Sequence, residues 1–246
     1  MTDYAAFARF YDRIMGDRDE EIARIRTYIS RYLPTARSLL ELGCGTGALL
    51  AGLAPQLAVT GIDRSAEMLA VAGEKLPEAR LVRGDMTAFR LPGRFDVVIC
   101  MFDTLNHVQS FAGWLTLFSC VHEHLAEGGL FIFDVNTAGR LRGLDDAPPY
   151  LDEFDGNVVL MTVRSAGDWL SLWRTRIFEH RGGDEYRLHD EPIYELAVPL
   201  DQLRAALAGR FELLEEASLD GSPVSDESDR VFFVYRHASA PPALAG

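Results

Sequence analysis

Short apolar runs alternate with amphipathic segments between Ser38 and Val135. The apolar runs lie at residues 37–42, 58–63, 79–83, 95–101 and 130–135. Runs without polar alternation are typical of parallel strands buried on both faces. The segments between them predict helices at residues 46–54, 66–76 and 111–125. We expect Ser65 to cap the second of these helices and Gly128 and Gly129 to end the third. The alternation predicts βαβ units and a parallel sheet.

Two more helices are predicted before the first strand. The first lies within residues 3–15, and its aromatic residues share one face: Tyr4, Phe7, Phe10 and Tyr11. The second covers residues 19–33 and ends at Pro34. Basic residues from Arg18 to Arg31 are interleaved with acidic ones, so we interpret this stretch as a solvated helix face.

The pattern changes after residue 150. Long strand-like runs follow at residues 157–164, 169–180 and 185–196. Two glycines between the last two runs predict a hairpin turn, and no run leaves room for a crossover helix. The region is therefore predicted to be antiparallel. A helix at about 199–208 and strands at 211–219 and 230–236 close the chain.

These elements together predict an α/β fold with one large sheet. We expect a Rossmann-like, doubly wound, mostly parallel seven-stranded sheet with helices on both faces, and an antiparallel β insert after strand five. The predicted division is an N-terminal helical cap at 1–34, the main domain at 35–145 and 197–236, the insert at 146–196 and a disordered tail at 237–246.

Composition narrows the classes of partner. The 246 residues carry 24 basic and 37 acidic side chains, a net charge of −13, which argues against a nucleic-acid partner. No apolar run approaches the roughly 20 residues of a membrane helix, so no membrane partner is expected. The three cysteines form no C-x-x-C pair, which predicts no metal site and fits a reducing cytoplasm.

A glycine loop follows the first apolar run and carries the first chemical signal. Its sequence, Glu41 to Gly47, is E-x-G-x-G-x-G. Glycine reaches positive φ and lets a ligand approach the backbone, and the next helix presents free N–H groups. Gly43, Gly45 and Ala48 also satisfy the dinucleotide pattern G-x-G-x-x-G/A. The loop alone leaves two cofactors open, a dinucleotide or S-adenosylmethionine.

Polar residues stand at the ends of the next strands, where an open α/β sheet binds its ligands. Asp63 ends the second run, twenty residues after Gly43, and can accept both hydroxyls of a ribose. Asp85 and Met86 follow the third run, and can bind an adenine through a carboxylate and a backbone N–H. Met68 is a candidate wall for the adenine ring.

Residues 35–136 resemble a class I S-adenosylmethionine-dependent methyltransferase in the order and spacing of these motifs. The resemblance implies that Asp63 holds the ribose, that Asp85 and Met86 hold the adenine, and that Tyr11 closes over the methionine end. The whole set of predicted cofactor contacts is Tyr11, Glu41, Gly43, Cys44, Gly45, Gly47, Asp63, Arg64, Met68, Asp85, Met86 and Met101. The antiparallel insert resembles that of amino-sugar N-methyltransferases.

The segment after the fourth run carries the candidate catalytic residues. His107 is the best base by its intrinsic pKa, Asp103 is second, and Tyr11 is a third candidate. The acidity of the pocket could keep His107 protonated. The aromatic residues that could line an acceptor pocket, or else form the core of the insert, are Tyr150, Trp169, Trp173 and Tyr194.

We therefore expect methyl transfer to a nitrogen or oxygen of a small molecule. Two alternatives stay open at this point, an NAD-dependent oxidoreductase and a non-catalytic module that binds S-adenosylmethionine. The lack of a second dinucleotide-binding half argues against NAD. The insert is expected either to cover the acceptor side of the site or to form a homodimer contact.

Overall fold

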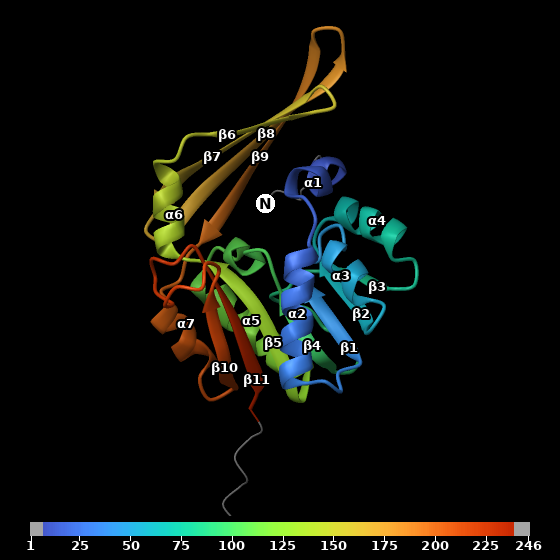
Figure 1. Ribbon diagram of the computed structural model, residues 1–246, viewed down its shortest axis with the longest axis vertical. Coiled ribbons are helices and arrows are strands. Elements are labelled where there is room, and N and C mark those ends of the chain that lie inside the picture. The colour runs from blue at the N-terminus through green and yellow to red at the C-terminus, as the bar shows by residue number, and fades with distance from the viewer. Residues whose placement is uncertain (1–6, 239–246) are drawn as a thin grey trace, which may run out of the picture.

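The computed structural model describes residues 7–238 and contains two sheets (Figure 1). The larger sheet has seven strands in the order β10-β11-β5-β4-β1-β2-β3, and β11 runs antiparallel to both of its neighbours. Its strands are β1 (Ser38–Leu42), β2 (Ala58–Asp63), β3 (Arg80–Arg83), β4 (Phe95–Cys100), β5 (Leu125–Asn136), β10 (Phe211–Ser218) and β11 (Arg230–His237). The predicted fold class is confirmed.

The apolar runs form the central strands because successive side chains enter two different cores. On β4, Val98 joins the core under α5 (Phe111–His124) and α7 (Leu200–Leu207), whereas Val97 joins the core under α2 (Asp19–Tyr32) and α3 (Ala48–Leu53). A polar residue on either face would be buried between helix and sheet.

Helix α4 (Ala66–Lys75) begins as predicted, but α5 ends earlier than its glycines suggested. Ser65 caps α4 by accepting a hydrogen bond from the Met68 N–H. Helix α5 ends at His124 because Leu125 already pairs with Phe95 in the sheet. The two glycines instead occupy an irregular part of β5, so the prediction that they end the helix is wrong.

The smaller sheet is the antiparallel insert, in the order β6-β7-β8-β9. Its strands are β6 (Tyr150–Phe154), β7 (Asn157–Gly167), β8 (Leu170–Gly182) and β9 (Glu185–Leu196). The hairpin between β8 and β9 lies where it was predicted: Gly182 pairs with Glu185, the turn is formed by Gly183 and Asp184, and both glycines have positive φ. In Figure 1 the insert rises from one end of the larger sheet and leans toward α1 (Ala8–Met15).

Three short elements were not predicted from the sequence. They are β6, the 3₁₀ turn η1 (Thr104–His107) and α6 (Ala138–Asp145). Helix α6 is only eight residues long, and its start depends on Thr137, whose hydroxyl accepts from the Arg140 N–H. Elements this short carry little periodicity of their own, so tertiary contacts decide whether they form.

Helix α1 lies between the two sheets. Its residues Phe7 and Ala8 pack with Phe154 and Ile177 of the insert and with Met68 of α4. Polar contacts also join α1 to both parts of the molecule. Arg9 pairs with Glu179 on β8 of the insert, and Asp12 accepts a hydrogen bond from Thr46 in the glycine loop of the main domain. The aromatic face of the N-terminal helix therefore packs on the insert as well as on the main domain.

The ends of the chain bear on two predictions. Strand β11 continues to His237 and the Ala238 N–H still bonds to the Arg210 carbonyl, so the predicted tail starts too early. The rest of that tail and Tyr4 lie outside the described residues. Within residues 7–238, no helix is long and apolar enough to cross a membrane.

Candidate functional site

A cavity of about 510 Å³ opens at the carboxyl ends of the central strands. Its wall is built from the glycine loop, the segments after β2, β3 and β4, the side chains of Tyr11 and Met68, and residues 192–194 of β9. The insert therefore borders the same cavity as the glycine loop. Predicted site residues in the wall are Tyr11, Gly43, Gly45, Asp63, Arg64, Met68, Asp85, Met86 and His107.

The other predicted residues lie behind this wall. Glu41 and Cys44 are buried below it, and Met101 belongs to the core between the sheet and α2. A Cβ on Gly47 would meet Ala72 and Leu76 of α4. The structure places Cys44, Gly47 and Met101 outside the cavity wall, in positions that support the loop.

All three loop glycines have positive φ, but a side chain would meet different surroundings at Gly43 and at Gly45. At Gly43 a Cβ would lie 2.3 Å from the Thr104 side chain, so that position is closed by η1. At Gly45 a Cβ would meet no atom within 4 Å, because its Cα faces open space at the cavity. Gly45 is therefore the glycine that leaves room for a ligand.

Asp63 is held in place by backbone donors. Its two carboxylate oxygens accept from the Gly45 N–H and the Ser65 N–H, each at 2.8 Å. A carboxylate oxygen can accept more than one hydrogen bond, so Asp63 keeps capacity for a diol. Asp85 is fixed in a similar way. Burial opposes its ionisation, but hydrogen bonds from Thr87 lower the pKa of Asp85.

Arg18 was missed by the sequence interpretation, which assigned its segment to a solvated helix face. Its side chain is buried, its guanidinium lies 3.8 Å from the centre of the Phe102 ring, and it donates to the Met15 carbonyl. Glu41 is also buried, and its Oε2 has no hydrogen-bond partner among the described residues. Burial and the charge of Asp63 raise the pKa of Glu41, while Arg18 lowers it.

The hydroxyl of Tyr11 is surrounded by carboxyl groups. Burial raises the pKa of Tyr11 to about 12, and Asp103, Glu41 and Asp63 push it in the same direction against Arg18. Tyr11 is therefore protonated at neutral pH. A phenol with this pKa is a hydrogen-bond donor and a poor general base.

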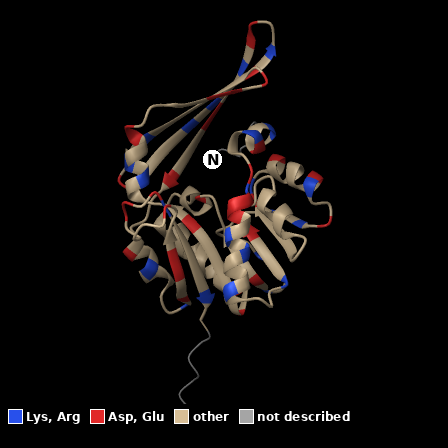
Figure 2. Ribbon diagram, viewed as in Figure 1, with Lys and Arg blue, Asp and Glu red and all other residues tan. Residues whose placement is uncertain are grey.

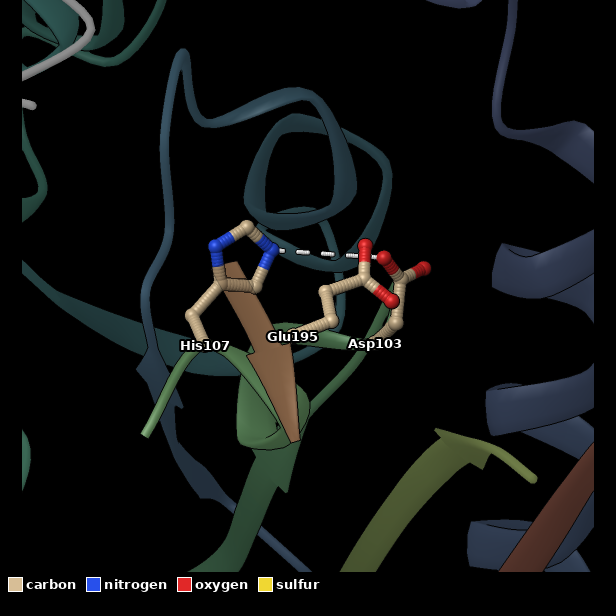
Figure 3. Close-up of side chains that lie close together, drawn as sticks. All are labelled: Asp103, His107 and Glu195. Carbon is tan, nitrogen blue, oxygen red and sulfur yellow. Dashed lines mark ion pairs between the residues drawn. The ribbon is translucent and has the colours of Figure 1, made fainter. Parts of the chain in front are cut away.

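His107 faces the cavity from the end of η1, close to two acids (Figure 3). Its Nε2 is 4.0 Å from Asp103 Oδ2, and single donor atoms of Asp103, His107 and Glu195 all lie within 4.8 Å of one another. Burial lowers the pKa of His107, although Asp103 and Asp63 act to raise it. This direction argues against an imidazole that the acidic pocket keeps protonated at pH 7.

Asp103 is held in an unusual backbone conformation. Phe102 and Asp103 both have positive φ, at 59° and 49°, which is uncommon for residues other than glycine. The Asp103 N–H donates to Asp134 at 2.9 Å, and the Asp103 carboxylate accepts from Arg230. Arg230 also donates to Asp134 at 2.9 Å. These bonds over-determine the strained turn, as is typical of functional sites.

The four aromatic candidates for an acceptor pocket are divided by the structure. Tyr194 lines the cavity. Trp173 packs against Ala138 and Leu141 of α6, while Tyr150 and Trp169 are about half exposed and are not in the wall. The wall residues that the sequence did not single out come mostly from the segment after β4 and from β9: Phe102, Thr104, Val108, Gln109 and Pro192.

The charges around the site have one dominant sign. Asp63, Asp85 and Arg64 are the charged side chains in the described cavity wall. Behind it lie the acids Asp103, Glu41 and Glu195 and the cations Arg18 and Arg230. Elsewhere acidic and basic residues are interspersed along α2 and the insert (Figure 2). Such an acidic site favours a cationic ligand over a pyrophosphate. Asp103, one of three side chains here whose arrangement could hold a metal ion, is already paired with Arg230. The expectation of no metal is not tested by this pair and stays a prediction.

Comparisons with known proteins agree with this geometry. Residues 39–129 match the family model described as a methyltransferase domain. A putative methyltransferase of Geobacillus sp. strain WCH70 is 28% identical over 242 residues, which cover 94% of this chain and 98% of that protein.

Two sugar-modifying enzymes are also similar. The dTDP-3-amino-3,6-dideoxy-alpha-D-glucopyranose N,N-dimethyltransferase of Streptomyces fradiae is 39% identical over 113 residues, 44% of each chain. The structure of CalS10 with S-adenosylmethionine bound, an amino pentose methyltransferase from Micromonospora echinaspora, has a TM-score of 0.77. It is 26% identical and the match covers 97% of this chain and 98% of that one. The chemistry of S-adenosylmethionine, the ligand of CalS10, suits the open space at Gly45.

Proposed function

Since the chain is a class I S-adenosylmethionine-dependent methyltransferase, we propose that it methylates an amine nitrogen of a small, sugar-like molecule. The alternatives of an NAD-dependent oxidoreductase and a non-catalytic binding module are set aside with that identification. The observation that carries the choice of nitrogen is the position of His107 in the cavity wall beside an acidic cluster. The similarity to sugar N-methyltransferases supports it.

The binding residues divide the cofactor between the strand ends. We assign the ribose hydroxyls to Asp63, and the adenine to Asp85, Met86 and Met68. Arg64 lines the same part of the cavity. We assign the methionine end to Gly43 and Gly45 under Tyr11, whose hydroxyl lies within reach of the charges of buried Arg18 and Glu41. Cys44, Gly47 and Met101 support this region from behind the wall.

Bound S-adenosylmethionine supplies a methyl group activated for in-line displacement by the acceptor. The protein's part is to align the nitrogen, exclude water and accept a proton. His107 accepts that proton at Nε2, and Asp103 stabilises the resulting imidazolium from 4.0 Å. Asp103 is a weaker candidate for the base because Arg230 holds its carboxylate. Tyr11 stays protonated and covers the site.

An amine fits this base better than an alcohol does. A neutral imidazole can remove a proton from an ammonium or from a nitrogen that gains positive charge during attack. An alcohol must lose its proton to become a strong nucleophile, which asks more of an imidazole base than removal of a proton from an ammonium does. The acidic surroundings also favour a cationic acceptor over an anionic one.

The test is a comparison of matched acceptors. Release of S-adenosylhomocysteine would be measured with 3-amino-3,6-dideoxyglucose, free and dTDP-linked, and with the corresponding 3-hydroxy sugars. We expect turnover with at least one amine and none with its hydroxy counterpart. Turnover with the alcohols alone would replace N-methylation by O-methylation.

A homodimer through the insert and a cytoplasmic location are further proposals. Leu151 and Leu188 are more than half exposed and share the outer face of the insert with Leu160 and Phe178. Such a face supports a contact between copies. Sedimentation velocity of the wild type and of Leu188→Asp would test the dimer, and cell fractionation would test the location.

A further inference from the structure

The turn that carries His107 is too short to hold its own position. The 3₁₀ turn η1 is four residues long. Within it the Asn106 N–H donates to the Asp103 carbonyl at 2.8 Å, and the Val108 N–H closes the turn at 3.1 Å. A 3₁₀ turn of this length has little stability of its own. The place of His107 therefore depends on contacts with the rest of the molecule.

The side chain of Asn106 makes three of these contacts and is fully buried. Its Oδ1 accepts from the Asn136 N–H at 3.0 Å, and its Nδ2 donates to the carbonyls of Asn136 and Leu196, both at 2.9 Å. These backbone partners need one acceptor and two donors, which is what a side-chain amide offers. A carboxylate in the same place would have no N–H for the two carbonyls.

The partners of Asn106 belong to two different sheets. Asn136 ends β5 of the larger sheet, and Leu196 ends β9 of the insert. In the described structure β4 pairs with β5 only as far as Phe133, so Asn106 takes the place of a strand partner beside Asn136. One amide thus joins the turn that carries His107 both to the larger sheet and to the strand that lines the other side of the cavity.

Trp114 of α5 holds the chain on the other side of His107. Its indole Nε1 donates to the Val108 carbonyl at 2.8 Å, and its ring is fully buried and lies edge-on to Phe118. The residues before and after His107 are therefore each fixed by a buried side-chain hydrogen bond. The imidazole itself faces the cavity.

We propose that Asn106 and Trp114 are positioning residues for His107, and that Asn106 makes the place of His107 depend on the place of the insert. Neither side chain belongs to the described cavity wall, so both act through the turn. A base must lie within hydrogen-bond reach of the proton it accepts, and a displacement of about 1 Å lowers the rate. The inference rests on the proposed function, because His107 is the base proposed there.

The test combines kinetics of the full chain with NMR of the His107 ring. Asn106→Asp keeps the size of the side chain and the oxygen that accepts from Asn136, but removes both donors. We expect kcat to fall about 10- to 100-fold. The KM should rise for whichever amino sugar turns over in the comparison above, because the bond to β9 is lost. The dissociation constant of S-adenosylmethionine, measured by calorimetry, should stay unchanged.

Trp114→Phe separates the two parts of the proposal. It removes the bond to the Val108 carbonyl and leaves the contact with the insert intact. We expect a lower kcat with an unchanged acceptor KM. In protein saturated with S-adenosylhomocysteine, the His107 ring should give one sharp set of NMR signals in the wild type. Exchange between positions should broaden these signals in both variants.

Asn157→Ala is the matched control. Asn157 is another buried asparagine, and its Oδ1 accepts from the His180 N–H at 2.9 Å near the β8–β9 turn, away from η1. The variant should lower the melting temperature, because a buried hydrogen bond is lost. Its kcat, its acceptor KM and its His107 signals should match the wild type. A purely structural role for Asn106 would give this same pattern.

Four results would overturn the inference. They are a wild-type kcat in a folded variant, one sharp set of His107 signals in both variants, a loss of cofactor affinity in either, and an unchanged acceptor KM in Asn106→Asp. If Asn106→Asp does not fold, Trp114→Phe still decides through its kcat and its ring signals.

Failure of the proposed function looks different. Full turnover by His107→Ala would remove the base, whereas the ring signals of the two variants would still report whether the turn is held. Transfer to alcohols alone would remove N-methylation, and the same variants would then be compared with the 3-hydroxy sugars.

Discussion

The guanidinium of Arg230 on β11 is ion-paired to the carboxylate of Asp103 at the end of β4, across 127 residues of sequence. Arg230 bonds to Asp134 as well, and Asp134 accepts from the Asp103 backbone. One side chain near the end of the chain thus fixes the turn that precedes His107. The strained backbone of Phe102 and Asp103 depends on that connection.

Arg230→Gln should destabilise the fold and the site together. Removing the partner of two largely buried carboxylates costs about 3–5 kcal/mol of unfolding free energy. Urea denaturation measures this loss, and NMR of His107 reports whether its surroundings change. Arg236→Gln, whose pair with Glu212 is more exposed, is the control and should cost less than about 1 kcal/mol. Equal effects of the two variants would contradict a special role for Arg230.

Asp63→Ala should weaken S-adenosylmethionine about tenfold or more, because two charge-assisted hydrogen bonds to the ribose are lost. Isothermal titration gives the dissociation constant. Glu74→Ala, on the exposed side of α4, should leave it unchanged. A wild-type constant for Asp63→Ala would mean that this carboxylate serves only the Gly45 and Ser65 backbones.

Gly45→Val should abolish cofactor binding and leave the fold largely intact. The position has φ of +51° and a Cβ there would point into open space at the cavity. Gly93→Val is a matched control, since Gly93 also has positive φ and no atom within 4 Å, but is not in the cavity wall. Both should lose about 1–2 kcal/mol of stability, and only Gly45→Val should lose binding. Intact binding by Gly45→Val would show that the loop does not touch the ligand.

His107→Ala should lower turnover about 10²- to 10⁴-fold and leave cofactor affinity nearly unchanged. His180→Ala, on the exposed part of the insert, serves as the comparison. A decrease of only a few fold would mean that the acceptor arrives deprotonated and that alignment carries the reaction.

The pH profile gives a second measurement at His107. Burial lowers the pKa of His107, so the imidazole stays neutral down to a pH below its ordinary value of about 6.5. Activity should therefore be retained at neutral pH and fall on the acid side of that value. This acid limb should be absent from the residual activity of His107→Ala. A limb at a pH above 7 would indicate a protonated imidazole instead.

The sequence predicted the parts of the molecule that depend on local pattern. Each buried strand, the glycine loop and each acid at a strand end lies within one short segment. The sequence could therefore place Asp63 and Asp85 at strand ends, and both line the cavity. Helix α6 and strand β6 were missed because their few apolar residues form no period. The ends of α5 and β5 were misplaced because pairing of Leu125 with Phe95 outweighs the turn preference of two glycines.

The rest of the site depends on contacts between distant segments. Arg18 lies in a segment interpreted as a solvated helix face, and Glu195 and Arg230 lie in predicted strands that gave no sign of a site. Only the fold brings them beside Glu41 and Asp103. Trp169 and Tyr150 show the reverse case, since large aromatic side chains on the insert remain half exposed. Local hydrophobicity does not show which face of the insert sheet borders the cavity.

The place of the insert between β5 and α7 has a consequence for how such enzymes diverge. Glycine loop, Asp63 and Asp85 all precede residue 90, whereas β9 enters the cavity from a separate sheet. Under the proposed function, mutations in β6–β9 change the acceptor contacts while the glycine loop, Asp63 and Asp85 keep their sequence. Libraries restricted to residues 150–196 should therefore yield new substrate ranges at little cost in cofactor affinity, with the two properties evolving almost independently.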